Sequence, residues 1–469
     1  TVYILEEYID GPEFGVELVM EAGTVVFCSV MEAAKQSWGQ CFQGTGRSFP
    51  CGYNALVQAS IASHCIAAAR ALGLTTGVLD MDVRHSQFGP RILEVNARMG
   101  GGSVAPMHDL VYNLDLVEVH LKTLLGVSVA HLAHCQPKDP TMCYEAGWVM
   151  SPQSGKIQGM DSFMEELQAT FAAQPDVISI TKLLEDGAGV VGYNEGLHSC
   201  LIQAVARGPS KDVAGQNLGT VLRTAEDRIT QVVVPRSEDQ SESVQPVASR
   251  TTSAVALTGI AALISVMVKE QRTVLVIGTG PRARNIDLFL KLSALGLRIV
   301  VVGEVGTWVV ELEQSGIVHK VVILPDVSTR KQDAELRDDV LQAVLAASVG
   351  EIHGVYNAYN KYLLLSSLVA ESLGVITNSY ESVRRCVFKH ETRACLIAEG
   401  LESWTTVSFT SLEEMETVAP FMRYPAVLKP AKGSGSVGVV KVSCADEALQ
   451  EFAKQAVQLP AGTVYILEE

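Results

Sequence analysis

The fold of this chain is decided by the run Glu94-Val95-Asn96-Ala97-Arg98-Met99-Gly100-Gly101-Gly102. It is preceded by Asp80-Met81-Asp82, and the turn signal Phe88-Gly89-Pro90 separates the two stretches. Both stretches are predicted to be strands of one hairpin, in which successive side chains alternate between two faces. Glu94 and Asn96 therefore share a face. Because the neighbouring residues are apolar, unpaired carboxylates there would be costly, and we expect them to bind a ligand.

The chemistry of this hairpin indicates a metal site. Carboxylate and amide oxygens are the ligands that Mg²⁺ prefers, and water and ATP phosphates fill the remaining positions. The acidic cluster of Asp80, Asp82 and Glu94, together with Asn96, is therefore a candidate Mg²⁺ site. The alternative is an exposed hairpin whose acidic face is simply solvated.

A second stretch, Lys429-Pro430-Ala431-Lys432-Gly433-Ser434-Gly435-Ser436-Val437-Gly438, places a lysine at the end of a strand, before a flexible loop. Glycines let a backbone approach a ligand closely, and successive N–H groups can surround phosphate oxygens. Lys429 would add a positive charge to such a site. The order of residues differs from the GxxxxGK[ST] phosphate loop, and an ordinary hairpin turn is the alternative.

The same heptapeptide, Thr-Val-Tyr-Ile-Leu-Glu-Glu, occupies residues 1–7 and 463–469. We interpret the chain as circularly permuted or as one period of a tandem repeat, so that its last third runs into its first. The functional site would then be divided between the two ends. The acidic segment Glu6–Glu17, which follows the first copy, carries carboxylates suited to ribose hydroxyls.

Composition limits the class of protein. With 469 residues and 48% hydrophobic content, the chain can form several domains with their own cores. A net charge of −16 argues against a basic surface for nucleic acid. Ten cysteines without a CxxC pair argue against zinc and favour a reducing, cytoplasmic location. The longest apolar run, residues 254–268, is shorter than the roughly 20 residues of a membrane span, so no membrane partner is expected.

The expected fold class is α/β with α+β lobes. Strand–helix alternation predicts a parallel sheet whose strands lie near residues 274–277, 298–302, 352–356 and 375–376. Single helices are predicted at residues 110–126 and 382–399. The predicted segments are a part with the acidic hairpin (1–127), a small α+β domain (128–234), a polar linker with an apolar helix (235–271), a Rossmann-like α/β domain (272–380) and a part with the glycine loop (381–469).

In the order Lys389, Lys429 with its glycine loop, Glu6–Glu17, Asp82 and then residues 94–98, these motifs resemble ATP-grasp ligases. The resemblance covers nearly all of the chain outside the linker, and the run 94–102 is its most specific part. Within that superfamily the chain is most similar to the L-amino-acid ligases, including the carnosine synthases of animals. It departs from them at Asp82, where the family usually has Glu.

The resemblance implies a role for each motif. Asp82, Glu94 and Asn96 would hold Mg²⁺, with Mn²⁺ as a possible substitute. Lys389 and Lys429 would contact the ATP phosphates, and the glycine loop would fold over them. The full set implied to contact ATP is Lys389, Lys429, Lys432, Gly433, Ser434, Gly435, Ser436, Glu6, Glu7, Ile9, Glu13 and, from the second heptapeptide, Glu468 and Glu469. Arg98, with Lys429, would be catalytic and stabilise an acyl phosphate or a tetrahedral intermediate. The implied reaction joins two amino acids into a dipeptide and releases ADP and phosphate.

Other functions stay open at this stage. A carbamoyl-phosphate-synthetase-like or biotin-carboxylase-like ATP-grasp enzyme would share these motifs, and an array could contain repeats without catalytic function. Gly278-Thr279-Gly280-Pro281-Arg282-Ala283, with Glu304 ending the next strand, resembles a dinucleotide fingerprint and would suit an NAD(P) oxidoreductase. The expected partners are ATP and amino acids, with neighbouring repeats or a homo-oligomer as protein partners. His108 is a candidate for lining the substrate pocket.

Overall fold

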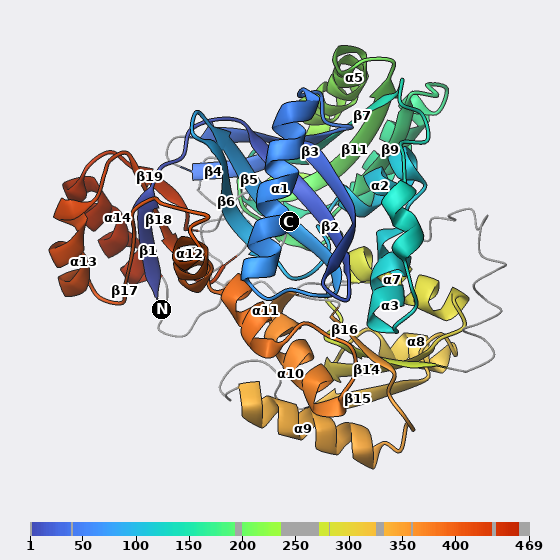
Figure 1. The fold of residues 1–469 in the computed structure, drawn as a ribbon. Coiled ribbons are helices and arrows are strands. Elements are labelled where there is room, and N and C mark those ends of the chain that lie inside the picture. Colours follow the sequence, from blue (N-terminus) through green and yellow to red (C-terminus); the bar gives the residue numbers. More distant parts are fainter. Residues whose placement is uncertain are drawn as a thin grey trace.

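The computed structural model describes residues 2–38, 41–192, 199–235, 272–280, 282–324, 333–357, 360–433 and 438–458. Within these ranges the strands form one large antiparallel sheet and two small sheets (Figure 1). The large sheet runs in the order β17-β1-β18-β19-β4-β3-β2-β5-β6, and β7, β11 and β9 continue from β4. The predicted class, α/β with α+β lobes, is confirmed.

A small lobe joins the beginning of the chain to its last quarter. Strand β1 (Tyr3–Glu7) lies between β17 (Thr406–Phe409) and β18 (Ala426–Pro430), antiparallel to both, and β19 (Val440–Val442) follows β18. Helices α13 (Leu412–Val418) and α14 (Ala445–Gln458) pack on this lobe (Figure 1). The first heptapeptide therefore fills a strand of the lobe, whereas the second lies outside the described residues.

The central part of the large sheet carries the acidic hairpin. Its strands are β2 (Glu13–Glu21), β3 (Thr24–Trp38), β4 (Cys41–Phe49), β5 (Gly77–Ser86) and β6 (Gly89–Asn96). Helix α1 (Ala55–Ala71) begins at Asn54, whose side chain accepts a hydrogen bond from the Val57 amide. Its buried face packs on the apolar side chains of β2 and β5. The predicted hairpin and its turn are present, with β6 as the edge strand.

A further lobe extends from the other side of the large sheet. Strands β7 (Cys143–Met150), β9 (Val177–Lys182) and β11 (Cys200–Gly208) are covered by α4 (Met160–Phe171) and α5 (Lys211–Ile229). A three-stranded sheet of β8 (Gly155–Ile157), β10 (Gly189–Val190) and β12 (Val233–Pro235) lies beside them. This part carries none of the predicted site residues.

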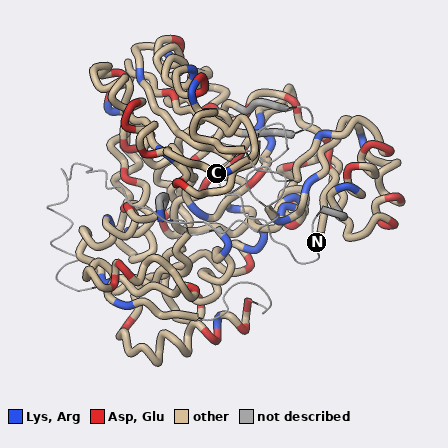
Figure 2. The backbone as a smooth tube through the Cα atoms, turned by 180° about the vertical axis from the view of Figure 1, so that it is seen from behind, with Lys and Arg blue, Asp and Glu red and all other residues tan. Residues whose placement is uncertain are grey.

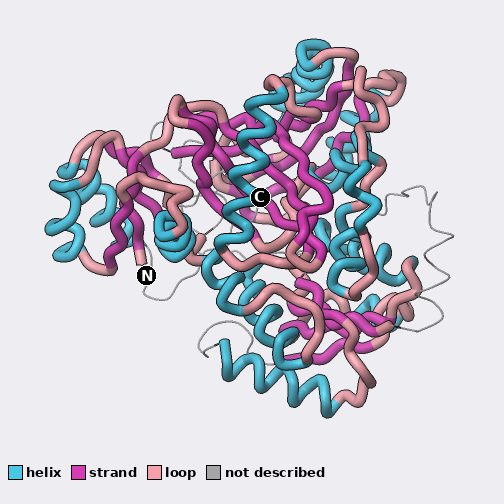
Figure 3. The backbone as a smooth tube through the Cα atoms, in the orientation of Figure 1, coloured by secondary structure: helices cyan, strands magenta, loops and turns pink. Residues whose placement is uncertain are grey.

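The predicted parallel sheet has the order β15-β14-β13-β16. Its strands, β13 (Thr273–Ile277), β14 (Arg298–Glu304), β15 (Lys320–Leu324) and β16 (Gly354–Asn357), are buried and rich in valine and isoleucine, as strands covered on both faces are. The helices around them are α7 (Arg282–Ala294), α8 (Val310–Gln314), α9 (Asp333–Ala346) and α10 (Leu363–Leu373) (Figure 3).

Three predicted elements differ from the structure. Residues 375–376 form no strand, because α10 ends at Gly374 and the chain then leads directly to α11 (Tyr380–Val387). The helix predicted at 382–399 is two helices, because Phe388 has extended backbone angles between α11 and α12 (Lys389–Ala398). The helix predicted at 110–126 is likewise divided into α2 (Val104–Tyr112) and α3 (Leu116–Leu124), because Asn113 is left-handed with φ 55° and Asp115 caps α3.

The distribution of charged residues and the hydropathy of the helices agree with the composition. Acidic and basic positions alternate over most of the backbone, and several Lys and Arg lie between the small lobe and the rest of the molecule (Figure 2). Among the described residues, no helix is long and apolar enough to cross a membrane. The apolar run 254–268 and almost all of the polar linker lie outside the described ranges.

Candidate functional site

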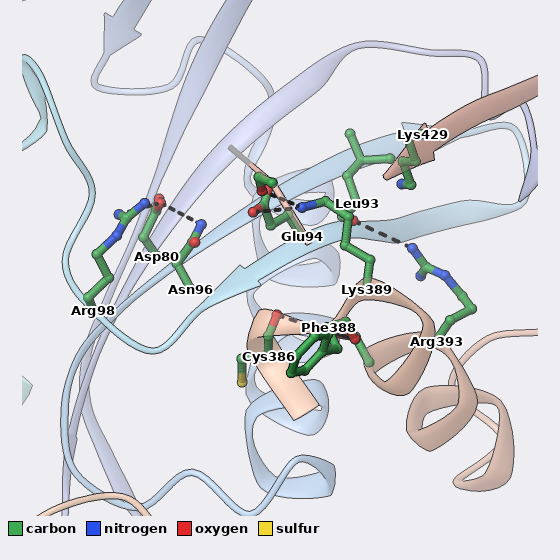
Figure 4. Close-up of polar contacts among 12 residues, drawn as sticks. Asp80, Leu93, Glu94, Asn96, Arg98, Cys386, Phe388, Lys389, Arg393 and Lys429 are labelled. Carbon is green, nitrogen blue, oxygen red and sulfur yellow. Dashed lines mark hydrogen bonds and ion pairs between the residues drawn. The ribbon is translucent and has the colours of Figure 1, made fainter. Parts of the chain in front are cut away.

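Helix α12 brings two cations onto three consecutive residues of the edge strand β6. Lys389 Nζ lies 3.2 Å from Glu94 Oε1. Arg393 Nη1 donates to the Ile92 carbonyl at 2.8 Å, and its Nη2 donates to the Leu93 carbonyl at 3.5 Å. Residues four apart lie on one face of a helix, so one face of α12 contacts residues 92–94 (Figure 4). Sequence reasoning predicted Lys389 and Glu94 in one site but missed Arg393.

A buried carboxylate joins these cations to Lys429. Glu6 on β1 forms an ion pair with Lys429 on β18, and Arg393 Nε lies 3.4 Å from the second Glu6 oxygen. Burial opposes ionisation of Glu6, but the charges of Lys429 and Arg393 outweigh it and hold the pKa of Glu6 below its usual value. Burial lowers the pKa of Lys429, and the charge of Glu6 opposes that effect. One carboxylate between two buried cations leaves an excess of positive charge, which suits an anionic ligand.

The acidic hairpin has the register that the metal prediction requires. Asp82 lies directly opposite Glu94, and Asp80 lies opposite Asn96. Asn96 Nδ2 donates to Asp80 Oδ2 at 3.2 Å, and Arg98 Nη1 lies 3.5 Å from the same oxygen. Figure 4 shows Arg98 and Asn96 converging on Asp80 at the end of the hairpin away from Arg393. The predicted alternation of faces is therefore present on both strands.

A β-bulge at Leu93 produces this register. Val83 pairs with Ile92 and Asp82 pairs with Glu94, so Leu93 is an extra residue in β6. The buried positions change from Pro90 and Ile92 before the bulge to Val95 and Ala97 after it. The same change from even to odd positions is visible in the order of apolar residues in the sequence, and it could have been used to predict the bulge.

A buried acid pair below the hairpin was also missed. Glu17 on β2 lies opposite Asp80 and accepts a hydrogen bond from the Gly100 amide at 2.9 Å. Burial and the neighbouring Asp80 charge raise the pKa of Glu17 well above its usual value, and burial with the charge of Asp82 raises that of Asp80 to about 6. A Cβ at Gly100 would lie 2.4 Å from Glu17 Oε1, so only glycine fits there. The sequence feature that could have predicted this pair is Glu17 itself, an acid inside an otherwise apolar strand.

The hairpin residues fit a hard cation. The Asp82 carboxylate has no hydrogen bond or ion pair to any described residue, and Asn96 donates through its nitrogen, which leaves its oxygen available. The described ranges contain no cluster of three or more His, Cys, Asp or Glu arranged to hold a metal. Two carboxylates and one amide oxygen are nevertheless consistent with Mg²⁺, which takes few protein ligands and completes its shell with water and phosphate oxygens.

The other predicted ATP contacts come from the end of β1 and the segment after it, and from the beginning of the glycine loop. Ile9 is buried, and its carbonyl accepts a hydrogen bond from Arg84 at 2.7 Å; Arg84 also forms an ion pair with Glu13 at 3.2 Å. Glu7 is partly buried at the end of β1. The Gly433 carbonyl accepts a hydrogen bond from Lys389 at 2.9 Å, and Lys432 lies over the Phe388 ring. Five predicted contacts lie outside the described residues: Ser434, Gly435, Ser436, Glu468 and Glu469.

His108 does not line a pocket, contrary to the prediction. Its side chain is fully buried among Phe27, Phe49 and Tyr112. Its Nε2 is 2.6 Å from Ser29 Oγ, and its Nδ1 is 2.8 Å from the Val104 carbonyl. Burial lowers the pKa of His108 to about 4, so it is a neutral core residue.

The protein's own side chains fill the dinucleotide-like turn. Gly278 has φ 77°, and a Cβ there would lie 2.1 Å from the ring of Tyr362. Glu304 accepts hydrogen bonds from the Tyr362 hydroxyl and from Lys361, the latter at 3.0 Å. The carboxylate predicted to hold a ribose is therefore engaged by the protein itself.

Comparisons with known proteins agree with the motifs. No family model matches the chain. Carnosine synthase 1 of Gallus gallus is 32% identical over 124 residues, which are 26% of this chain and 13% of that protein. An uncharacterized protein of Sinorhizobium fredii, y4rH, is 23% identical over 240 residues, which are 50% of this chain and 45% of its own length. The predicted resemblance to carnosine synthases is confirmed.

The resemblance is partial in extent. The chain spans less than half of the length of either relative. Among solved structures, an L-amino acid ligase from Bacillus licheniformis superposes with a TM-score of 0.37 and 18% identity, over 46% of this chain and 53% of that one. The circular permutation or tandem repeat stays a prediction.

Proposed function

We propose that this protein is an ATP-grasp carboxylate–amine ligase that joins two amino acids through an acyl phosphate. One observation carries the proposal: Lys389 and Glu94, far apart in the sequence, lie 3.2 Å apart, with Asp82 opposite Glu94 on the neighbouring strand. A cation for phosphate thus adjoins an oxygen donor set for Mg²⁺, which is the combination that phosphoryl transfer needs.

The cations would bind and orient the nucleotide. Lys389 and Lys429 are both buried, and Glu6 balances only part of the positive charge around Lys429. Negative phosphate oxygens would therefore be favoured beside Lys389 and Lys429. Lys389 contacts the Gly433 carbonyl as well as Glu94, so it is already directed toward the beginning of the glycine loop. Positioning and electrostatic stabilisation supply most of the catalysis in reactions of this type.

The acidic hairpin would hold the metal. Asp82, Glu94 and the oxygen of Asn96 are the donors, and Lys389 limits the repulsion between the two carboxylates by neutralising Glu94. Mg²⁺ bound there would neutralise charge on the transferred phosphoryl group. Asp80 would orient Asn96 and Arg98, since it accepts from Asn96 and lies within ion-pair distance of Arg98.

Arg98 would act on the acyl group. In the proposed reaction a substrate carboxylate oxygen attacks the γ-phosphorus, and the bond to the bridging oxygen of ADP breaks. The amine of a second amino acid then attacks the acyl carbon, the amine loses a proton, and phosphate leaves. Arg98 follows the metal strand directly and is partly exposed, so its guanidinium can contact the developing negative charge.

Two observations favour amino acids as substrates. The sequence similarity is to carnosine synthases, and the run Arg98-Met99-Gly100-Gly101-Gly102 is the feature on which the resemblance to amino-acid ligases rests. The engagement of Glu304 by Tyr362 and Lys361 disfavours an NAD(P) oxidoreductase. A bicarbonate-dependent ATP-grasp enzyme is the second candidate, because it would use the same lysines and metal donors.

The test is ADP release by the full chain with Mg²⁺-ATP and pooled amino acids, beside K429M as control. We expect release that depends on amino acids and is lost in K429M, with a product whose mass equals two amino acids minus water. Release that depends on bicarbonate instead would favour the second candidate. Absence of ADP with every amino-acid mixture and with bicarbonate would contradict the ligase proposal.

A further inference from the structure

Two adjacent carbonyls of β6 accept hydrogen bonds from one side chain, which a regular strand does not allow. In a β-strand, successive carbonyls point to opposite edges. Here the Ile92 and Leu93 carbonyls both accept from the guanidinium of Arg393, at 2.8 and 3.5 Å. The bulge at Leu93 turns the second carbonyl to the same side. Arg393 therefore recognises the bulged backbone rather than an ordinary strand edge.

The bulge decides where Glu94 points. Side chains alternate along a strand, so a shift of one residue moves every later side chain to the opposite face. Ile92 is buried in the core before the bulge, and Val95 is buried in it after the bulge. If Leu93 were instead a regular, paired residue of the strand, an Ile92 facing the core would force Glu94 toward the core and Val95 toward the site. The bulge thus allows Glu94 and Asn96 to face Asp82 and Asp80.

Arg393 is itself held firmly. It is among the largest fully buried side chains, with 1% of its surface exposed. Its guanidinium carbon lies 4.2 Å from the centre of the Trp404 ring, and its Nε pairs with Glu6. A planar, forked guanidinium can donate to two acceptors at once, which the single point charge of lysine does less well.

A second charged residue, Glu402, binds the outer edge of β6 beside Arg393. Glu402 Oε1 accepts a hydrogen bond from the Ile92 amide at 3.0 Å and lies 3.1 Å from His64 Nε2. The outward amide and carbonyl of Ile92 are thus bound by Glu402 and Arg393, which take the place of a neighbouring strand. Only Arg393 also contacts Leu93, the bulged residue.

We propose that Arg393 is a positioning residue that fixes the Leu93 bulge and thereby sets Glu94 opposite Asp82. Because Arg393 and Lys389 are on one face of α12, the same helix places the phosphate-binding lysine and the metal strand relative to each other. The consequence for metal binding rests on the proposed function, but the role in the backbone does not. In this proposal Arg393 acts through the backbone of residues 92 and 93, and not as a ligand of substrate or metal.

The test compares R393K with wild type and with R272K. Arg272 is a matched control because its Nη1 also donates to a backbone carbonyl, that of Leu125 at 2.7 Å, far from the site. Hydrogen–deuterium exchange of peptides covering residues 89–97 reads the bulge directly. Electron paramagnetic resonance of added Mn²⁺ reads the metal site without requiring activity. A second variant, R393Q, removes the charge and is measured at a temperature where its near-UV circular dichroism matches wild type.

In R393K we expect faster exchange confined to residues 89–97 and a 10–100-fold weaker Mn²⁺ affinity, the usual loss when a residue supporting metal ligands is changed. kcat should fall more than KM for ATP rises. Unchanged exchange at residues 89–97 would overturn the proposal, and so would faster exchange spread over the sheet to the same extent in R272K. If wild type binds no Mn²⁺ and releases no ADP, the proposed function fails, and the exchange result alone decides the role of Arg393.

Discussion

Two acids of this protein are contacted by a lysine at almost the same distance, yet their surroundings differ completely. Glu304 lies 3.0 Å from Lys361 and also accepts from the Tyr362 hydroxyl. Glu94 lies 3.2 Å from Lys389, but Asp82 stands opposite it, and Lys429 and Arg393 share the carboxylate of Glu6 as their ion-pair partner among the described residues. The first ion pair is satisfied within the protein. The second belongs to a group with an unpaired acid and excess cation, which is the arrangement that the proposed binding of a metal and an anion requires.

The largest effect should come from removing the cation at the second pair. K389M is expected to lower ADP release about 10³-fold, because a preorganised charge beside the reacting phosphate contributes several kcal/mol to the transition state. Steady-state rates with saturating Mg²⁺-ATP measure it. The matched variant K361M changes the cation of the first pair and should retain wild-type rates. Equal losses in both variants would remove the distinction between the two regions.

Acid should weaken the packing between the large sheet, which carries Glu94, and the parallel sheet, which carries Glu304. His120 accepts a hydrogen bond from the Val78 amide on β5, beside the acidic hairpin, and its ring contacts Tyr356 on β16 of the parallel sheet. Burial lowers the pKa of His120 to about 4. The unfolded chain binds this proton near pH 6.5, so the contribution of His120 to stability should decrease as pH falls from about 6.5 to 4, by on the order of 3 kcal/mol.

Urea unfolding at a series of pH values checks this prediction, with H120N as the comparison. Asparagine can accept from the same amide but does not titrate. The difference in stability between wild type and H120N should therefore change with pH only between about 4 and 6.5. A difference that is constant over this range would show that His120 is not the responsible group.

The metal prediction is sharpened by changing Asp82. D82N keeps the size of the side chain but removes its charge, and Asp82 has no partner among the described residues that would be left unpaired. We expect about a tenfold to 100-fold higher Mg²⁺ concentration for half-maximal rate, by analogy with the loss on weakening a metal site. D82E introduces the residue that the ATP-grasp ligases, which the sequence resembles, usually carry at this position, and it should keep the Mg²⁺ requirement close to that of wild type. A Mg²⁺ requirement unchanged in D82N would exclude Asp82 as a ligand.

The smallest effect is expected at the first pair itself. The Glu304 side chain is 44% exposed, and exposed ion pairs contribute about 0–1 kcal/mol. E304Q should therefore lower the free energy of unfolding by less than about 1 kcal/mol and leave ADP release unchanged. Urea unfolding and the ADP assay measure the two quantities. A strong loss of activity in E304Q would revive a role for the parallel sheet in the reaction.

Sequence reasoning predicted the parts of the site that depend on local pattern. The hairpin, its turn and the face shared by Glu94 and Asn96 follow from alternation within about 20 residues. Arg393 could not be found in this way, because its partners Ile92 and Leu93 lie some 300 positions earlier in the chain. The break at Phe388 was missed for a similar reason, since the Lys389 amide donates to the Ala431 carbonyl across the lobe. Pairings between distant segments leave little trace in the local pattern.

The position of β1 has a consequence for the integrity of the molecule. Residues 3–7 form an inner strand of the large sheet, and both neighbouring strands, β17 and β18, come from residues 406–430. A protease that cut the chain anywhere between residues 236 and 271 would yield two fragments that both contribute strands to one sheet. The amino-terminal fragment would keep its first strand hydrogen-bonded on both edges to the carboxy-terminal one. Such a nicked protein should migrate as one particle in native conditions and separate only when the small lobe unfolds.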